Sequence, residues 1–248
     1  MGNPLQGAGY FIQGLRLIFK PGIRRFSLIP LVINIVLFSG LITLGYQEFG
    51  NLVDWLVSFL PDWLTWLRLL IWPIFALTVA LVVFFSFSMI ANLVGAPFNG
   101  PLAAAVERYL DNGSLQEKSP PGSLIKDSAA AILNELHKIG YFLLRAIPLW
   151  ILFLIPGLNL VAPILWLFFS AWLLCQEYAD YPMGNHDLSF SAQRRRLRER
   201  RMASLGFGFV TMLANMTPIF NFIVMPVAVA GATVLWKEQL KEVVSTRD

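Results

Sequence analysis

Two long runs without a charged residue constrain this chain more than any other feature of its sequence. Residues 26–46 and residues 69–94 contain no Asp, Glu, Lys or Arg. The hydrocarbon core of a bilayer is about 30 Å thick, so a helix needs roughly 20 apolar residues to cross it. A proline lies near the start of each run, Pro30 and Pro73, where a membrane helix tolerates it. We therefore predict two full transmembrane helices, 26–46 and 69–94.

The overall composition agrees with a membrane protein. Hydrophobic residues make up 56% of the 248 residues and charged residues only 14%, and the mean hydropathy is +0.63. Soluble domains carry about 25% charged residues, and a soluble globule with so few charges would not cover its surface. The sequence therefore predicts an all-α integral membrane protein, organised as a single membrane domain.

Two later apolar regions have a different pattern. Residues 146–175 and 206–236 are each about 30 residues long, which is too long for one ordinary span and too short for two. Each is interrupted by a Pro-x-x-Asn motif, ending at Asn159 and at Asn221. Proline removes a backbone donor and asparagine favours a turn. We predict two partially inserted, re-entrant helical hairpins, whose asparagines either cap the turns or border a polar passage.

The remaining segments are polar or amphipathic, and their charges orient the chain. Residues 1–25 hold four basic residues and no acid, whereas the connector 47–68 holds three acids and one arginine. Cytoplasmic loops carry the excess of Lys and Arg, and tryptophans lie at the membrane interface. The connector, with Trp55, Trp63 and Trp66, is expected to face outward. The segments expected on the cytoplasmic side are the N-terminal 1–25, which includes a short amphipathic surface helix at 8–20, the helical region 95–145, the basic segment 176–205 and the tail 237–248.

Chemistry-bearing residues are too few for an enzyme. The chain has one cysteine, Cys175, and two histidines, His137 and His186. It contains no nucleophile elbow, phosphate-binding loop or metalloprotease motif. We predict no catalytic residue, no metal site and no cofactor. The arginine-rich run at 194–201 is interpreted as an inner-leaflet anchor rather than a nucleic-acid site, because no recognition motif surrounds it.

The segment before the first long run combines features of an anion site. Pro21 and Gly22 favour a turn, and the first N–H groups of the following helix have no partner within it. A helix N-terminus attracts anions, and Arg24 and Arg25 add planar donor arrays. No acid lies in residues 20–26, which suits sulfate, an anion without a proton at pH 7. Alternatively, the two arginines anchor the helix to lipid headgroups.

Further polar residues are expected either to line a route or to tie helices together. Two prolines and small residues at 95–101 are expected to break the helix at the membrane edge, with a new helix from Pro101. Glu107 and Arg108 then either pair with other helices or lie on a surface hinge. The residues with this open role are Asn34, Asn92, Asn99, Glu107, Arg108, Asn159, Asn215 and Asn221.

Taken together, Gly22–Arg25, the Ala-Pro-Phe-Asn-Gly stretch at 96–100 and the two Pro-x-x-Asn hairpins resemble the CysZ family of bacterial sulfate permeases. The resemblance covers essentially the whole chain. It implies a multi-pass protein of the bacterial inner membrane that admits sulfate for cysteine biosynthesis. It also implies sulfate binding at Gly22, Ile23, Arg24 and Arg25, with Ile in place of the family's Leu, and a homo-oligomer built from dimers, with subunits in opposite orientations.

The mechanism is expected to be channel-like. Proton-coupled carriers usually place Asp, Glu or His within their membrane helices, and the stretches 26–46, 69–94, 146–175 and 206–236 contain none of these. We therefore predict a sulfate permease without proton coupling. The alternative function is a non-transporting membrane scaffold or regulatory protein.

Overall fold

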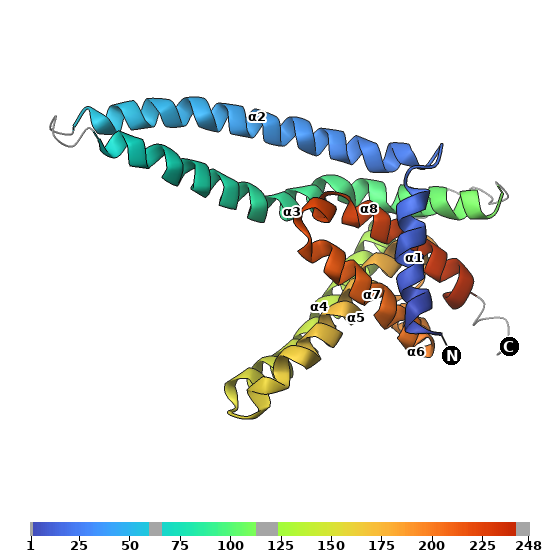
Figure 1. The fold of residues 1–248 in the computed structure, drawn as a ribbon. Coiled ribbons are helices and arrows are strands. Elements are labelled where there is room, and N and C mark those ends of the chain that lie inside the picture. Colours follow the sequence, from blue (N-terminus) through green and yellow to red (C-terminus); the bar gives the residue numbers. More distant parts are fainter. Residues whose placement is uncertain (1, 60–65, 113–123, 242–248) are drawn as a thin grey trace. The chain divides into compact units, whose positions relative to one another are not determined.

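The regular structure of the described residues is entirely helical, which confirms the all-α prediction (Figure 1). The structure is a computed structural model and describes residues 2–59, 66–112 and 124–241. Its elements are α1 (Pro4–Leu17), α2 (Arg24–Val57), α3 (Leu67–Leu110), α4 (Leu124–Leu154), the 3-10 turn η2 (Leu158–Leu160), α5 (Ala162–Gly184), α6 (Phe190–Glu199), α7 (Arg201–Met216), α8 (Pro218–Leu235) and the π-helical turn η3 (Trp236–Leu240).

The chain divides into two compact units, which we call the long-helix unit (Leu28–Pro97) and the core unit (Met1–Ser27 with Phe98–Asp248). In the long-helix unit, α2 and α3 pack through aromatic rings. The rings of Phe49 and Phe75 are stacked with centroids 3.6 Å apart, and this contact lies beyond the predicted end of the first span. Helix α2 runs to Val57, so residues 47–57 continue it instead of forming a separate interfacial helix. Trp63 lies outside the described residues.

The structure corrects the expected helix break at residues 95–101, because α3 continues through them. A proline removes its own N–H donor, but its fixed φ is compatible with a helix. Leu102, Ala103 and Val106 follow directly and are completely or almost completely buried. Burial of this apolar face stabilises the helix beyond the prolines, which sequence spacing alone does not reveal.

The core unit is built around α8, which contacts α1, α5 and α7. In the apolar segment Ile223–Leu240, which runs from α8 through η3, 67% of the residues are buried. Helix α1 approaches this centre closely, since a Cβ added at Gly14 would collide with the backbone of Val227 and Gly231. The expected surface helix at 8–20 thus starts earlier, at Pro4, and packs into the core with Tyr10, Phe11 and Leu17 buried.

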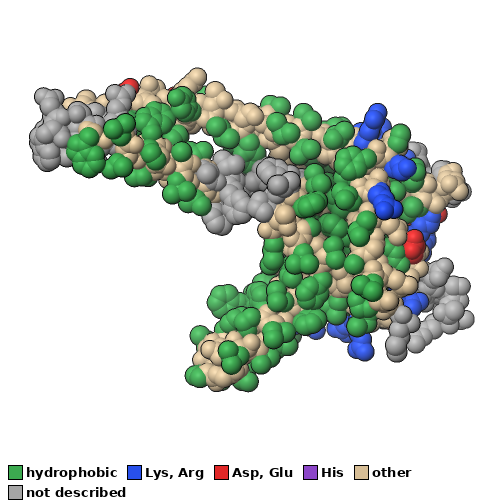
Figure 2. Space-filling model, in the orientation of Figure 1, with side chains coloured by type: hydrophobic (Ala, Val, Ile, Leu, Met, Phe, Trp, Pro, Cys, Tyr) green, Lys and Arg blue, Asp and Glu red, His purple; other side chains and the backbone are tan. Residues whose placement is uncertain are grey.

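Helices α4 and α5 form the first of the two predicted hairpins. Their connection lies at residues 155–161, where Gly157 has a φ of 88°, a conformation that glycine adopts without strain. The arms are longer than the predicted 146–175, because the apolar segments run from Leu136 to Leu154 and from Leu158 to Gly184. Hydrophobic side chains cover the projecting hairpin in Figure 2.

Helices α7 and α8 form the second hairpin, and they are joined at Thr217. The turn therefore precedes the predicted motif, with Pro218 as the first residue of α8 and Pro226 inside it. Proline is well placed at a first helical position, where its missing donor costs nothing. Four described helices are long and apolar enough to cross a membrane. Partial insertion of the hairpins stays a prediction.

Candidate anion-binding site

The turn between α1 and α2 is set by one glycine and one buried isoleucine. Gly22 has a φ of 86°, in the region that glycine favours. Ile23 is 1% exposed and anchors the turn in the core. The Lys20 carbonyl accepts from the N–H groups of Ile23 (3.1 Å) and Arg24 (3.0 Å). Among the described residues, the N–H groups of Gly22 and Arg25 have no backbone acceptor, so these two amides are the ones available to a ligand.

A hollow of about 550 Å³ lies beside this turn, between it and the end of α3. It brings together two predicted groups that are far apart in sequence, Gly22, Ile23 and Arg25 on one side and Arg108 on the other. Arg24 is exposed and is not among the lining residues. The complete lining is Pro21, Gly22, Ile23, Arg25, Ala105, Arg108, Tyr109 and Asn112.

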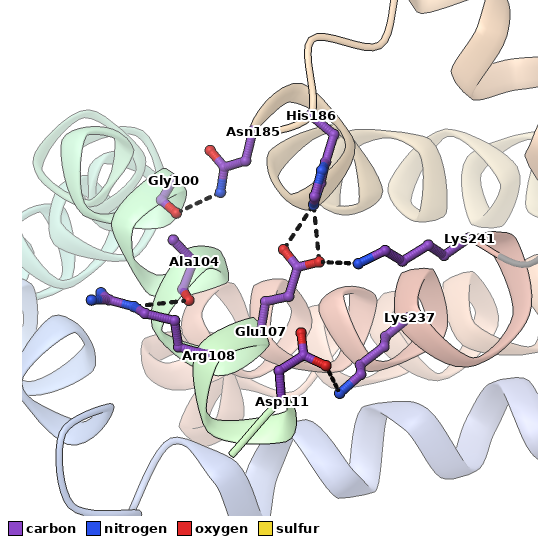
Figure 3. A network of polar contacts seen from close by, with 9 residues as sticks. All are labelled: Gly100, Ala104, Glu107, Arg108, Asp111, Asn185, His186, Lys237 and Lys241. Atoms are coloured by element: carbon purple, nitrogen blue, oxygen red, sulfur yellow. Dashed lines mark hydrogen bonds and ion pairs between the residues drawn. The ribbon is translucent and has the colours of Figure 1, made fainter. Parts of the chain in front are cut away.

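The acids at the end of α3, Glu107 and the following Asp111, point to a different side from Arg108, as Figure 3 shows. Glu107 is 3% exposed, and both its carboxylate oxygens lie 2.9 Å from Nε2 of His186. An ionised carboxylate only accepts hydrogen bonds, so His186 is the donor. Lys241 Nζ lies 3.2 Å from Oε1 of Glu107, and Lys237 Nζ lies 2.6 Å from Oδ1 of Asp111.

Because the acids pair with His186 and the two lysines, the arginines at the hollow leave it with an excess of positive charge. Arg108 Nε donates a long hydrogen bond of 3.4 Å to the Ala104 carbonyl, and the Arg25 guanidinium lies 4.7 Å from the centre of the Phe26 ring. Among the described residues, neither arginine has an ion-pair partner. The residues that line the hollow therefore include two arginines and two amides without a backbone acceptor, and no carboxylate. Such donors are the set that a fully ionised oxyanion needs.

The predicted asparagines do not gather at this hollow. Asn99 lies near Tyr181 and Asn215 lies near Tyr178, both on α5, and Nδ2 of Asn99 is buried without a hydrogen-bond partner among the described residues. Asn34 is buried at 4% exposure with Oδ1 unpaired, whereas Asn159 is exposed at the tip of the first hairpin. The side chains of Asn92 and Asn221 lie outside the described residues.

Sequence reasoning missed several members of this region. Tyr109 and Asn112 line the hollow, and His186, Lys237 and Lys241 hold the acids. One signal was present in the sequence, because Glu107 and Asp111 are four residues apart, as are Lys237 and Lys241. Residues at this spacing share a helix face, so the two pairs are complementary. The spacing did not predict which helices pack against each other.

Comparisons with known proteins agree over nearly the full chain. A family described as sulfate transporter CysZ/etoposide-induced protein 2.4 matches residues 10–226. A protein of Pseudomonas aeruginosa (strain LESB58) named sulfate transporter CysZ is 43% identical over 235 residues, which cover 94% of both chains. Proteins of the same name from Pectobacterium atrosepticum and Salmonella typhimurium are each 42% identical, over 97% and 94% of this chain and 87% and 92% of theirs.

Proposed function

The chain belongs to the sulfate transporter CysZ/etoposide-induced protein 2.4 family, and from this premise we propose that it carries sulfate across the bacterial inner membrane for incorporation into cysteine. The family is one of transporters and not of enzymes, as the sequence predicted. Four helices long enough to cross a bilayer support a multi-pass protein. The observation that carries the proposal is the hollow in which Arg25 and Arg108 lack a carboxylate partner.

Sulfate suits this donor set better than phosphate does. At neutral pH sulfate carries two negative charges and no proton, so every oxygen only accepts hydrogen bonds. Monohydrogen phosphate also donates one and favours a site with a carboxylate acceptor. The Gly22 and Arg25 amides and the Arg25 and Arg108 guanidiniums are all donors. We propose that they form the sulfate site, with Ile23 anchoring the turn and Arg24 contributing long-range charge.

The route is proposed to be channel-like and independent of protons. Moving one charge across 100 mV costs about 2.3 kcal/mol, so a dianion entering a negative interior costs about 4.6 kcal/mol. Inward flux then depends on the sulfate gradient and on consumption inside. The predicted membrane stretches contain no Asp, Glu or His to relay a proton. The pair formed by buried Glu107 and partly exposed His186 lies outside those stretches.

Partial insertion of the first hairpin also belongs to this proposal. A complete crossing by Leu136–Leu154 would place Arg145 near the middle of the bilayer, where an arginine costs about 2.5–3.5 kcal/mol or more. Residues 146–176 contain no charge. We therefore propose that the membrane boundary lies at Arg145 and that only the following residues are inserted. The homo-oligomer of oppositely oriented subunits stays a prediction from the family resemblance.

The deciding experiment measures radioactive sulfate uptake into liposomes that contain only this protein. We expect time-dependent uptake above that of protein-free liposomes, driven by the sulfate gradient and unchanged by an inward proton gradient. Uptake that rises steeply with the proton gradient would contradict the uncoupled mechanism. The absence of uptake by folded, correctly assembled protein would favour the alternative of a non-transporting scaffold.

A further inference from the structure

A second pair of arginines lies away from the hollow, and both guanidinium groups lie over the same aromatic ring in the core unit. The guanidinium carbon of Arg145 on α4 is 3.9 Å from the centre of the Tyr141 ring, and that of Arg194 on α6 is 4.5 Å from it. The Tyr141 ring is fixed from a third helix, because Trp172 Nε1 on α5 donates to its hydroxyl at 2.9 Å. Three helices thus hold two cations at one place.

These two charges have no anion of their own. Among the described residues neither Arg145 nor Arg194 has an ion-pair or hydrogen-bond partner, and Nε of Arg194 is buried and unpaired. The carboxylate that α5 contributes nearby, Asp180, accepts from Lys138 Nζ and from Gln193 Nε2, both at 2.7 Å. Both guanidinium carbons lie within 4.5 Å of one ring centre, so they are at most twice that distance apart.

Two guanidinium groups at this spacing repel each other unless an anion lies between them. Charge-assisted hydrogen bonds from arginine to a phosphate oxygen are about 2.8 Å long. A tetrahedral oxyanion with one such bond to each arginine bridges the available separation. The ring supplies the stacking face that arginine favours, so both donors stay in position before the anion binds.

The surroundings indicate where that oxyanion comes from. Arg145 is followed by 31 uncharged residues, 146–176, and large apolar side chains next to it, including Leu144 and Ile147, are exposed. A phosphate at Arg145 would therefore have acyl chains beside it that fit the apolar surface.

We propose that Arg145, Arg194 and Tyr141 form a headgroup site for an anionic phospholipid at the base of the α4–α5 hairpin. The arginines bind the phosphate, and the acyl chains lie against the exposed apolar side chains of α4 and α5. The site fixes the depth to which the hairpin enters the bilayer. It is separate from the hollow at Gly22 and Arg108, and it does not depend on whether sulfate is transported.

The test measures phosphatidylglycerol binding to the full chain in phosphatidylcholine nanodiscs, by native mass spectrometry and by the shift in unfolding temperature as phosphatidylglycerol is added. The site variant is Arg145→Gln with Arg194→Gln. The matched control is Arg195→Gln with Arg198→Gln, which removes two exposed arginines of the same helix. Each arginine near an anionic headgroup contributes about 1 kcal/mol, so we expect the site variant to bind phosphatidylglycerol at least tenfold more weakly and the control less than threefold.

Equal weakening in both variants would overturn the proposal, since it would reduce the effect to general surface charge. Free sodium sulfate serves as the soluble competitor. If it raises the unfolding temperature as much as phosphatidylglycerol does, and if the site variant loses this shift, the lipid assignment is overturned in favour of a soluble oxyanion. If the glutamine variant does not fold in phosphatidylcholine alone, the double variant Arg145→Lys with Arg194→Lys is used to test the site instead. It keeps both charges and loses the planar donors, so its binding should weaken severalfold, and unchanged binding would contradict the site.

Discussion

Both carboxylate oxygens of Glu107 lie 2.9 Å from Nε2 of His186, although the two residues are 79 positions apart. The next residue, Arg108, faces the hollow beside Gly22. Two adjacent residues of α3 therefore differ in their pairing: Glu107 has cationic partners, whereas Arg108 has no ion-pair partner among the described residues. Glu107 therefore ties the end of α3 to other helices of the core unit, while Arg108 stays exposed beside the hollow.

The first prediction concerns sulfate affinity at the hollow. Arg25→Gln and Arg108→Gln each remove a charged donor, and hydrogen bonds to charged groups contribute about 1.5–3 kcal/mol. We expect each change to weaken sulfate binding roughly tenfold or more, measured by isothermal titration calorimetry in detergent. Arg24→Ala combined with Arg25→Ala should abolish measurable binding and leave folding intact.

Arg24→Gln is the internal control, because Arg24 neighbours Arg25 but does not line the hollow. It removes the same charge without removing a contact, so we expect an effect of a fewfold that declines as chloride screens it. Equal losses for Arg24→Gln and Arg25→Gln at high ionic strength would contradict the hollow as the binding site and leave the headgroup-anchor interpretation.

A second prediction tests the turn itself. Gly22→Ala places a Cβ on a residue with a φ of 86°, which costs about 1–2 kcal/mol for most residues. The turn should relax and sulfate binding should weaken. Gly22→Asn should be milder, because asparagine adopts this conformation more readily than other non-glycine residues. Because a Cβ at Gly22 meets nothing within 4 Å, equal effects of the two variants would show that backbone strain is not the cause.

A third prediction concerns stability at the Glu107 network. Glu107→Gln removes a charge that pairs with His186 and Lys241, whose side chains are 30% and 43% exposed. Solvent screens such partners, so we expect a loss of about 1–2 kcal/mol, seen as an unfolding temperature lower by several degrees. Glu199→Gln, at an exposed position on α6, should leave the unfolding temperature unchanged. A Glu107→Gln protein as stable as its parent would show that the network adds nothing to folding.

A fourth prediction uses two glycines of α1. Gly14→Ala drives a Cβ into the backbone of Val227 and Gly231, and such overpacking costs about 1–3 kcal/mol. Gly9→Ala meets nothing within 4 Å, and alanine is the better helix former by up to about 1 kcal/mol. Thermal unfolding in detergent should therefore move in opposite directions for the two variants. A tolerated Gly14→Ala would mean that α1 does not pack against α8.

The sequence alone predicted those properties that depend on local composition. The uncharged runs indicated membrane helices, and the proline motifs indicated two hairpins. The residues 20–26 indicated an anion site because the helix start, the glycine and the arginines are adjacent in the chain. Helix ends were less predictable. Pro97 and Pro101 did not stop α3, because the burial of Leu102 and Val106 outweighs a lost hydrogen bond.

Only the tertiary structure decided which distant residues meet. Arg108 lies beside Arg25 at one hollow, while Glu107 pairs with His186 and Lys241. The spacing of these residues along the chain does not predict which of them meet. Hydropathy records how favourably a residue leaves water, which is a property of each side chain by itself. Contacts between helices depend on how their faces fit in three dimensions, as at Gly14 against Val227, and so the partners of a charge emerge only once the helices are packed.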